Sequence, residues 1–317
     1  MRPGYDRCAV DAYAVSLEPV VAVAVPATYV VAVSLIFLEF FLLRILGRPA
    51  SFRGGATSLL SGGLAFGLTA VANVLAYAGA LEWAWAHRVW TIGLSPLAWL
   101  AALLAYDFSF WLAHLVGHRV RLFWCVHSVH HTTTEMRLST AVRGSALDFV
   151  HVPWFFVWVP LLGVHPMMLL TVEAAGRIWG VLTHVSPHFV GRGGRWVRAL
   201  ERWFVTPSLH RVHHGRQARY LDRNYGEVFS VWDRLFGTFT PEDPREPPEY
   251  GLRVAPGQRP IDDESLAEVQ LSPWRALARD LRRAPGWTAR LRYLFDAPGW
   301  SHEGPDARVR PGRRPSA

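Results

Sequence analysis

Ten of the chain's 14 histidines are gathered in four short clusters. Residues three or four apart share one face of an α-helix, so each cluster aims two or three imidazole rings at a common point. Imidazole is the commonest metal ligand in proteins and suits zinc, copper, iron and nickel. One ion cannot use ten rings, whereas two ions could share them, so the sequence predicts a two-metal site. The clusters are His114 and His118; His127, His130 and His131; His184 and His188; and His210, His213 and His214.

The other residues narrow the choice of metal. The only two cysteines, Cys8 and Cys125, lack the spacing of a metal-thiolate site or a disulfide framework. This disfavours structural zinc and iron–sulfur clusters. Many neutral nitrogen donors suit a redox pair of first-row ions, iron above all.

Metal-bound histidines usually donate their second ring N–H to a carboxylate or a carbonyl. Asp107 lies seven residues, about two helical turns, before His114 and is predicted to be such an acceptor. Asn224, Asp222 and Glu135 are weaker candidates, since each could simply be a solvated loop residue.

Long uncharged segments must position these histidines. Segments 19–43 and 89–113 carry one acid each, Glu39 and Asp107, and segment 56–81 carries no charged residue. Each exceeds the roughly 20 residues that cross a bilayer core about 30 Å thick, so membrane spans are favoured over buried helices of a soluble core. The sequence predicts an all-α, multi-pass membrane protein with about three full transmembrane helices.

A fourth apolar segment, 148–182, contains three prolines and is too short for two full crossings, which need about 40 residues. A single crossing would put the last two histidine clusters on the opposite side of the membrane from the first two. We therefore expect a helical hairpin that enters and returns on the same side, and that is short, tilted or only partly embedded.

The net charge of +8 comes from arginine alone, because all 33 basic residues are arginine. The excess of arginine over acidic residues lies in residues 1–240, the membrane-proximal part of the chain. This position favours anionic lipid headgroups over nucleic acid as the partner. Arginines typically flank the cytoplasmic ends of spans. The loop after segment 19–43 and the histidine-rich helical cap are therefore predicted to face the cytoplasm. The arginines that indicate this orientation are Arg44, Arg48, Arg53, Arg119 and Arg121.

Three regions are predicted along the chain: an N-terminal segment at 1–18, a membrane-embedded domain at 19–240 and a cytoplasmic tail at 241–317. Within the tail, residues 272–295 have an amphipathic pattern between arginines. Such a helix could lie on the membrane surface or dock on the cap, and the pattern favours neither.

The motifs resemble those of the fatty acid hydroxylase and sterol desaturase superfamily of membrane di-iron enzymes. They are H-x3-H at 114–118 and H-x2-H-H at both 127–131 and 210–214. A second H-x3-H at 184–188 and the runs NYG at 224–226 and WDRLFGT at 232–238 add to the resemblance. TPSLHRVHHG at 206–215 and HSVHHTTTEMRLSTAVR at 127–143 are most similar to the alkylglycerol monooxygenase-like branch. The resemblance covers about residues 30–255.

The resemblance implies that all ten histidines are catalytic residues that bind two irons. Dioxygen would be the co-substrate, and a C–H bond of a fatty acyl, sterol or ether lipid would be hydroxylated or desaturated. It also implies an external electron donor, a separate redox partner that docks on the arginine-rich cytoplasmic face. A metal-binding transporter or sensor without oxygenase activity is the alternative. Transporters usually place their ligands within the spans near the midplane, which disfavours it.

Overall fold

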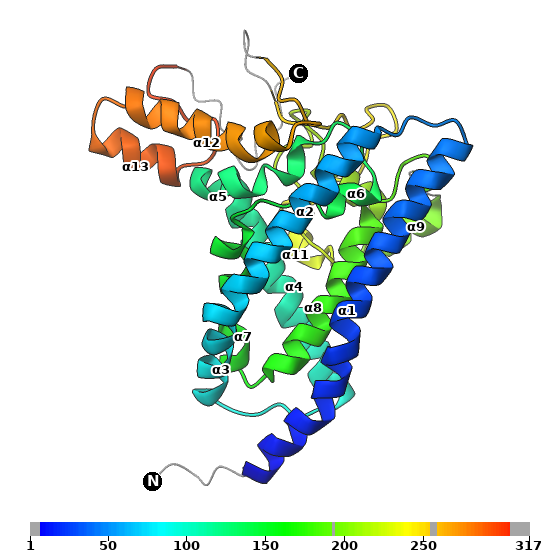
Figure 1. Cartoon of the computed structure of the whole chain (residues 1–317), viewed down its shortest axis with the longest axis vertical. Helices are drawn as coiled ribbons and strands as arrows, with labels where there is room; N and C mark the ends of the chain where they lie inside the picture. The colour runs from blue at the N-terminus through cyan, green and yellow to red at the C-terminus, as the bar shows by residue number, and fades with distance from the viewer. Residues whose placement is uncertain (1–6, 192–193, 254–258, 305–317) are drawn as a thin grey trace.

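The computed structural model describes residues 7–191, 194–253 and 259–304 (Figure 1). Within these ranges the chain is helical, and its only extended pairing is an isolated bridge between Phe204 and Phe229. The all-α prediction is confirmed for this part of the chain. The long helices are α1 (Arg7–Ile45), α2 (Phe52–Ala72), α4 (Pro96–Arg119), α8 (Pro166–Thr183) and α12 (Leu266–Arg283).

Three helical stretches are long and apolar enough to cross a membrane, as predicted: Ala27–Ile45, Phe52–Ala86 and Pro96–Arg119. The second continues from α2 through a π-helical turn, η1 (Asn73–Tyr77), into α3 (Ala78–Ala86). The third begins seven residues later than the apolar segment does. Ser95 caps it by accepting a hydrogen bond from the Ala98 N–H, and Pro96 occupies the first helical position.

Helix α1 begins at Arg7 and so includes part of the predicted N-terminal segment 1–18. Residues 1–6 of that segment lie outside the described residues.

The predicted hairpin is present and reaches further than its residue count suggested. Its descending arm is formed by η3 (Asp148–Val150), η4 (Val152–Phe156) and α7 (Trp158–Leu161), and α8 returns (Figure 1). Its turn lies beside the loop before α4, where the Val89 N–H donates to the Leu161 carbonyl at 2.9 Å. Much of the descending arm is 3₁₀-helix, which rises about 2.0 Å per residue against 1.5 Å in an α-helix. The descending arm therefore spans a given length with fewer residues than an α-helix would need.

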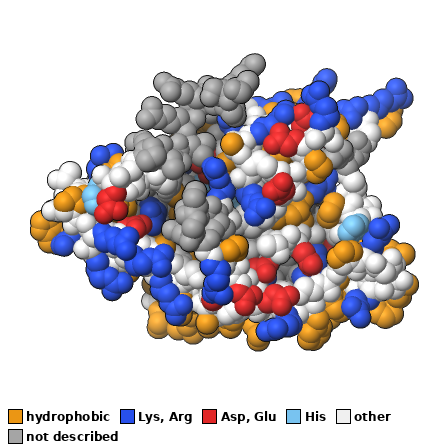
Figure 2. All heavy atoms as spheres, turned by 90° about the horizontal axis from the view of Figure 1, so that it is seen from above, with side chains coloured by type: hydrophobic (Ala, Val, Ile, Leu, Met, Phe, Trp, Pro, Cys, Tyr) orange, Lys and Arg blue, Asp and Glu red, His pale blue; other side chains and the backbone are white. Residues whose placement is uncertain are grey.

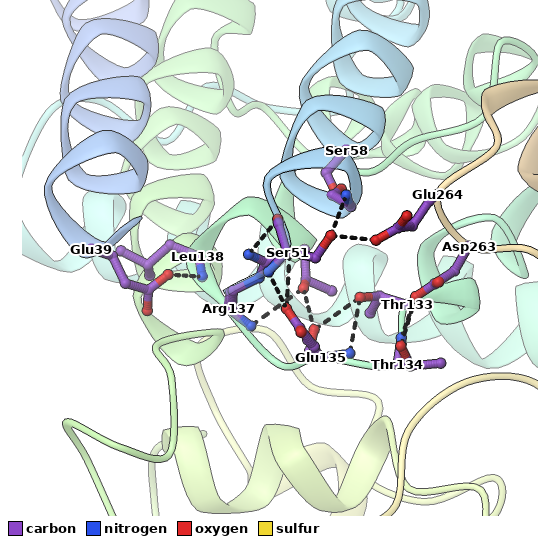
Figure 3. A network of polar contacts seen from close by, with 12 residues as sticks. Glu39, Ser51, Ser58, Thr133, Thr134, Glu135, Arg137, Leu138, Asp263 and Glu264 are labelled. Atoms are coloured by element: carbon purple, nitrogen blue, oxygen red, sulfur yellow. Dashed lines mark hydrogen bonds and ion pairs between the residues drawn. The ribbon is translucent and has the colours of Figure 1, made fainter. Parts of the chain in front are cut away.

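A polar network joins the first loop to the histidine-bearing end of the bundle (Figure 3). The Glu39 carboxylate accepts hydrogen bonds from the backbone N–H groups of Leu138 (2.7 Å) and Ser186 (2.8 Å). Arg137 donates to the Ser51 carbonyl at 2.9 Å. Glu39, the single acid of the first span, thus holds both α6 (Leu138–Ala141) and the segment after α8 against α1.

The amphipathic segment forms two helices, α12 and α13 (Trp287–Phe295), since the chain turns at Ala284, Pro285 and Gly286. Leu277 of α12 and Tyr293 of α13 pack against the buried Cys125 of α5 (Arg121–His127). Docking on the cap is therefore the arrangement that the structure has. Charged side chains gather on this end of the molecule, and hydrophobic side chains border its lower edge (Figure 2).

Contacts also cross the predicted boundary at residue 240. Glu242, just after it, forms an ion pair with the buried Arg211 at 2.8 Å. Residues 254–258 and 305–317 of the predicted tail lie outside the described residues.

Candidate metal centre

Local helix signals place the histidines. His114 and His118 lie one turn apart on the last two turns of α4. The TPSLHRVHHG segment forms α10 (Pro207–His213), in which Thr206 accepts a hydrogen bond from the Leu209 N–H at 3.4 Å and Pro207 starts the helix. The remaining rings project from the end of α5, from η2 (His130–Thr132) and from the end of α8, where His184 follows Thr183.

Nine of the ten histidines converge in two groups, and within each group all the ligand nitrogens lie within 4.8 Å of one another. The groups adjoin, because the rings of His131 and His214 are stacked with centroids 4.4 Å apart. Each H-x-x-H-H triplet is divided between the groups rather than aimed at one point as predicted. Group 1 is His114, His118, His127, His131 and His213; group 2 is His130, His184, His210 and His214.

The nitrogen geometry fits shared cations. His184 and His213 each donate their Nδ1–H to a carbonyl, so Nε2 presents a lone pair. The Nε2 atom of His184 faces that of His210 at 2.9 Å, and the Nε2 atom of His213 faces that of His131 at 3.1 Å. Such lone pairs repel unless a cation lies among them. Metal–imidazole bonds of about 2.1 Å put two ligands of one ion about 3 Å apart, which matches these separations.

Two further nitrogens support this interpretation. The Nε2 atoms of His114 and His118 are buried and have no hydrogen-bond partner among the described residues. An unsatisfied buried polar atom is costly, and a metal bond would satisfy it.

Burial keeps the imidazoles in their neutral, metal-binding form. It lowers the pKa of His130, His184 and His213 to about 3, and charge on neighbouring histidines acts in the same direction. These rings are therefore unprotonated at neutral pH, as metal ligation requires.

The acceptors that orient the rings are mostly backbone carbonyls. His114 donates from Nδ1 to the Tyr225 carbonyl at 2.8 Å, His213 to Arg223 at 2.9 Å and His184 to Gly180 at 2.7 Å. Local sequence signals could not find these, because every residue carries a carbonyl. His118 Nδ1 lies 3.2 Å from the carboxylate of Asp222, one of the weaker sequence candidates.

Asp107 and Asn224 contact no histidine ring through a hydrogen bond in the described part of the chain. Asp107 instead accepts hydrogen bonds from the N–H groups of Val228, Phe229 and the Trp232 indole, because its side chain faces the loop that follows Asn224. The Asn224 amide bridges the Leu209 and Thr240 carbonyls. Both residues hold the backbone that positions the ligands.

Two buried residues that the sequence did not single out brace the same backbone. Asp233, in the WDRLFGT motif, accepts from the Tyr225 and Gly226 N–H groups at 2.8 and 2.9 Å. Arg143 joins the Ser58 hydroxyl of α2 to the Thr132 hydroxyl beside the first triplet. Both residues lie in quoted motifs, Asp233 in WDRLFGT at 232–238 and Arg143 at the end of HSVHHTTTEMRLSTAVR at 127–143, but the motifs did not indicate which backbone each residue braces.

His188 is not brought together with the other nine. It is exposed and lies outside both groups, because α8 ends at Thr183 and Pro187 turns the chain away. His151, in contrast, is buried and lines the cavity beside the histidines.

A largely apolar cavity of about 820 Å³ leads to the histidines. Its walls come from α1, α2, α4, α8 and the hairpin's descending arm. Tyr29 of α1 and Phe66 of α2 line it, and each is about half exposed. The cavity thus reaches from the faces of two candidate spans to both groups. The histidines in its wall are His114, His127, His130, His184 and His210.

The chain is similar in sequence to known hydroxylases and monooxygenases. A family described as fatty acid hydroxylase matches residues 99–238. Alkylglycerol monooxygenase of Caenorhabditis elegans is 34% identical over 226 residues, which is 69% of this chain and 43% of that protein. The Homo sapiens alkylglycerol monooxygenase is 34% identical over 164 residues, 50% of this chain and 34% of that protein. Ornithine lipid hydroxylase OlsE of Rhizobium tropici is 28% identical over 152 residues, 45% of this chain and 43% of that protein. The chain therefore spans less than half the length of each of these relatives. No solved structure matches it.

Proposed function

The chain carries a fatty acid hydroxylase domain over residues 99–238, and from this premise we propose that it is a membrane-bound di-iron oxygenase that hydroxylates a C–H bond of a lipid. The observation that carries the proposal is the pair of adjoining histidine groups at the end of an apolar cavity. The relatives' names are those of lipid-oxidising enzymes, which favours an oxygenase over a metal transporter or sensor.

In this proposal groups 1 and 2 each hold one iron. Bound there, the iron pair supplies the activation of dioxygen that attack on an unactivated C–H bond requires. Hydroxylation puts one oxygen atom into the C–H bond and reduces the other to water, which consumes two electrons and two protons. All-nitrogen ligation by neutral rings leaves the charge of the irons uncompensated, which suits a redox role better than a structural one.

The protein's own part is to orient and to enclose. Fixed acceptors at Tyr225, Arg223 and Gly180 hold the rings of His114, His213 and His184 in one tautomer, with Nε2 toward the group. The apolar cavity takes the lipid chain from the bilayer and keeps water from the reacting carbon.

We also propose that the histidine-bearing end faces the cytoplasm, where a separate electron donor reaches it. Support comes from a cleft of about 420 Å³ between α5 and α12, lined by Arg121, Arg279 and Arg283 and also by Asp280, which pairs with Arg121 at 2.6 Å. Trp124 lies one turn after Arg121, and its ring centroid is 4.9 Å from that of His118 and 5.5 Å from that of His131. The cleft offers an acidic redox protein a basic surface close to group 1.

Iron content and lipid oxidation test the function together. Purified protein is expected to hold two irons per chain. His213→Ala (group 1) and His130→Ala (group 2) should each lower the iron content and abolish lipid oxidation. His188→Ala is the matched control, because the exposed His188 should be dispensable for both. If both variants kept full iron and full lipid oxidation, the proposal would be wrong. Mass spectrometry of the product separates hydroxylation, which adds oxygen, from desaturation, which removes two hydrogens.

A further inference from the structure

Helix α13 carries an apolar stripe on the face that does not dock on the cap. Trp287, Leu291 and Phe295 are four residues apart, so they share one face of the helix, and they keep 75%, 52% and 57% of their accessible surface. The opposite face, with Ala289 and Tyr293, packs against α12 and α5. Docking therefore uses one side of α13 and leaves the stripe exposed in the described part of the chain. Three large apolar side chains in one exposed row indicate a surface that covers them.

The position of α13 indicates which surface this is. Helices α12 and α13 extend sideways from the histidine-bearing end of the bundle, with α13 on the side nearer the spans (Figure 1). In the same view α13 is level with the end of α1 and the start of α2, where the candidate spans Ala27–Ile45 and Phe52–Ala86 reach this end. Because the docked face of α13 meets α12, the stripe faces away from α12, on the side of the spans. A bilayer crossed by these spans would have its surface at the stripe.

Arginines border the stripe. Arg290 and Arg292 lie on its two sides, and the Arg290 guanidinium is 5.2 Å from the centre of the Trp287 ring. Residues 282–296 contain four arginines and one acid, which gives this segment a net charge of +3. Tryptophan and arginine beside an apolar row are typical of a helix in the headgroup region of a membrane. There the apolar side chains enter the hydrocarbon boundary, and the guanidinium groups meet anionic headgroups.

A second segment has the same combination. Trp196 and Leu200 of α9 (Arg195–Leu200) and Trp203 just after it are 73%, 55% and 64% exposed. Residues 195–203 contain three arginines and one acid. Helix α9 lies near the same end of the molecule but on the opposite side of the bundle from α13 (Figure 1). One protein partner would cover a single patch, whereas a bilayer surrounds the bundle and reaches both segments.

We propose that α13 rests on the surface of an anionic bilayer, with Trp287, Leu291 and Phe295 below the headgroups and the bordering arginines among them. Helix α13 is then held from two sides, by the cap through Tyr293 and by lipid through the stripe. The inference rests on the membrane placement of the candidate spans in the proposed function. It does not depend on the metal or on lipid oxidation.

Quenching of a fluorescent label by brominated lipids tests the contact. Full-length protein with Cys8→Ser is labelled with the fluorophore NBD at a new cysteine, Leu291→Cys, and reconstituted in phosphatidylcholine nanodiscs. Cys125 is buried, and the Cys8→Ser parent shows whether it takes up label. Phe295→Cys is a second reporter on the same stripe, so the test stands even if Leu291→Cys fails to fold.

Two control positions calibrate the quenching. Arg275→Cys is the matched control in the same pair of helices: Arg275 is exposed, and it lies two residues from the buried Leu277 and so on the side of α12 that faces away from α13. Leu64→Cys reports on the spans, because Leu64 is 42% exposed in α2. The Leu64 label should be quenched by any brominated lipid, and the Arg275 label by none.

The lipid that carries the bromine tests the charge. A small fraction of the lipid is brominated, either as anionic phosphatidylglycerol or as neutral phosphatidylcholine at the same fraction. Phosphatidylglycerol should quench the Leu291 label about fivefold more strongly, the factor that corresponds to one arginine near an anionic surface. Arg282→Gln combined with Arg290→Gln should remove most of this preference and leave the Leu64 label unchanged.

Two results would overturn the proposal. One is a Leu291 label that is quenched no more than the Arg275 label, as water or another protein chain over the stripe would produce. The other is equal quenching of the Leu291 label by the two lipids. An unquenched Leu64 label would refute the membrane placement of the spans and this inference with it. A quenched Leu64 label beside an unquenched Leu291 label would refute this inference alone.

Discussion

The carboxylate of Asp107 is a buried link between α4 and the loop that orients His114. It accepts hydrogen bonds from the Val228 N–H (2.8 Å) at one oxygen, and from the Phe229 N–H (3.1 Å) and the Trp232 indole (2.9 Å) at the other. Asp107→Asn keeps the shape but replaces one oxygen with an N–H₂ donor. In its better orientation the amide loses the Val228 bond and weakens the other two.

The cost follows from typical hydrogen-bond energies. A bond to a charged group contributes about 1.5–3 kcal/mol and one to a neutral group about 1 kcal/mol. The substitution should therefore destabilise the protein by about 3–5 kcal/mol. At about 2–4 °C per kcal/mol for large domains, Tm should fall by about 10 °C.

Thermal unfolding in detergent, with and without bound iron, is the assay. Because Asp107 contacts no imidazole, the fall in Tm should be similar in both forms. Glu249→Gln is the control, since its carboxylate is 62% exposed in a surface pair with Arg216 and should change Tm little. If Asp107→Asn kept the wild-type Tm but lost its iron, Asp107 would act on the metal centre directly and our reasoning would be wrong.

Three further predictions concern the cavity and its walls. Gly176→Ala should destabilise the protein by about 1–3 kcal/mol, measured as a fall in Tm, because the new Cβ would lie 2.4 Å from the Tyr106 ring. Burial raises the pKa of Glu227 to about 7, above its usual 4.5, so this group costs stability as pH rises from about 4.5 through 7. Glu227→Gln should accordingly raise Tm at pH 8 by an amount equivalent to a few kcal/mol and leave Tm at pH 4 nearly unchanged; a rise of equal size at both pH values would contradict this. Gly63→Phe should leave Tm and iron content intact, since a Cβ there meets no atom within 4 Å, yet slow lipid oxidation by filling the cavity between α1 and α2; unchanged turnover would show that lipid does not use this route.

Features that depend on neighbouring residues could be predicted from the sequence alone. Apolar length predicted the three candidate spans, and the spacing of the histidines predicted their convergence. The need for one common site predicted a returning hairpin. Helix start signals were also local: the serine before Pro96 and the threonine before Pro207 set where α4 and α10 begin.

Only the tertiary structure decided which rings meet and what holds them. His130 joins His184, 54 residues later, and not its neighbour His131, because the short η2 helix turns adjacent rings to different sides. Asp107 faces an indole and two amides about 121–125 residues away, and His188 turns outward after Pro187. Spacing along a chain specifies a helix face, whereas the partner of that face depends on contacts between segments that the spacing does not encode.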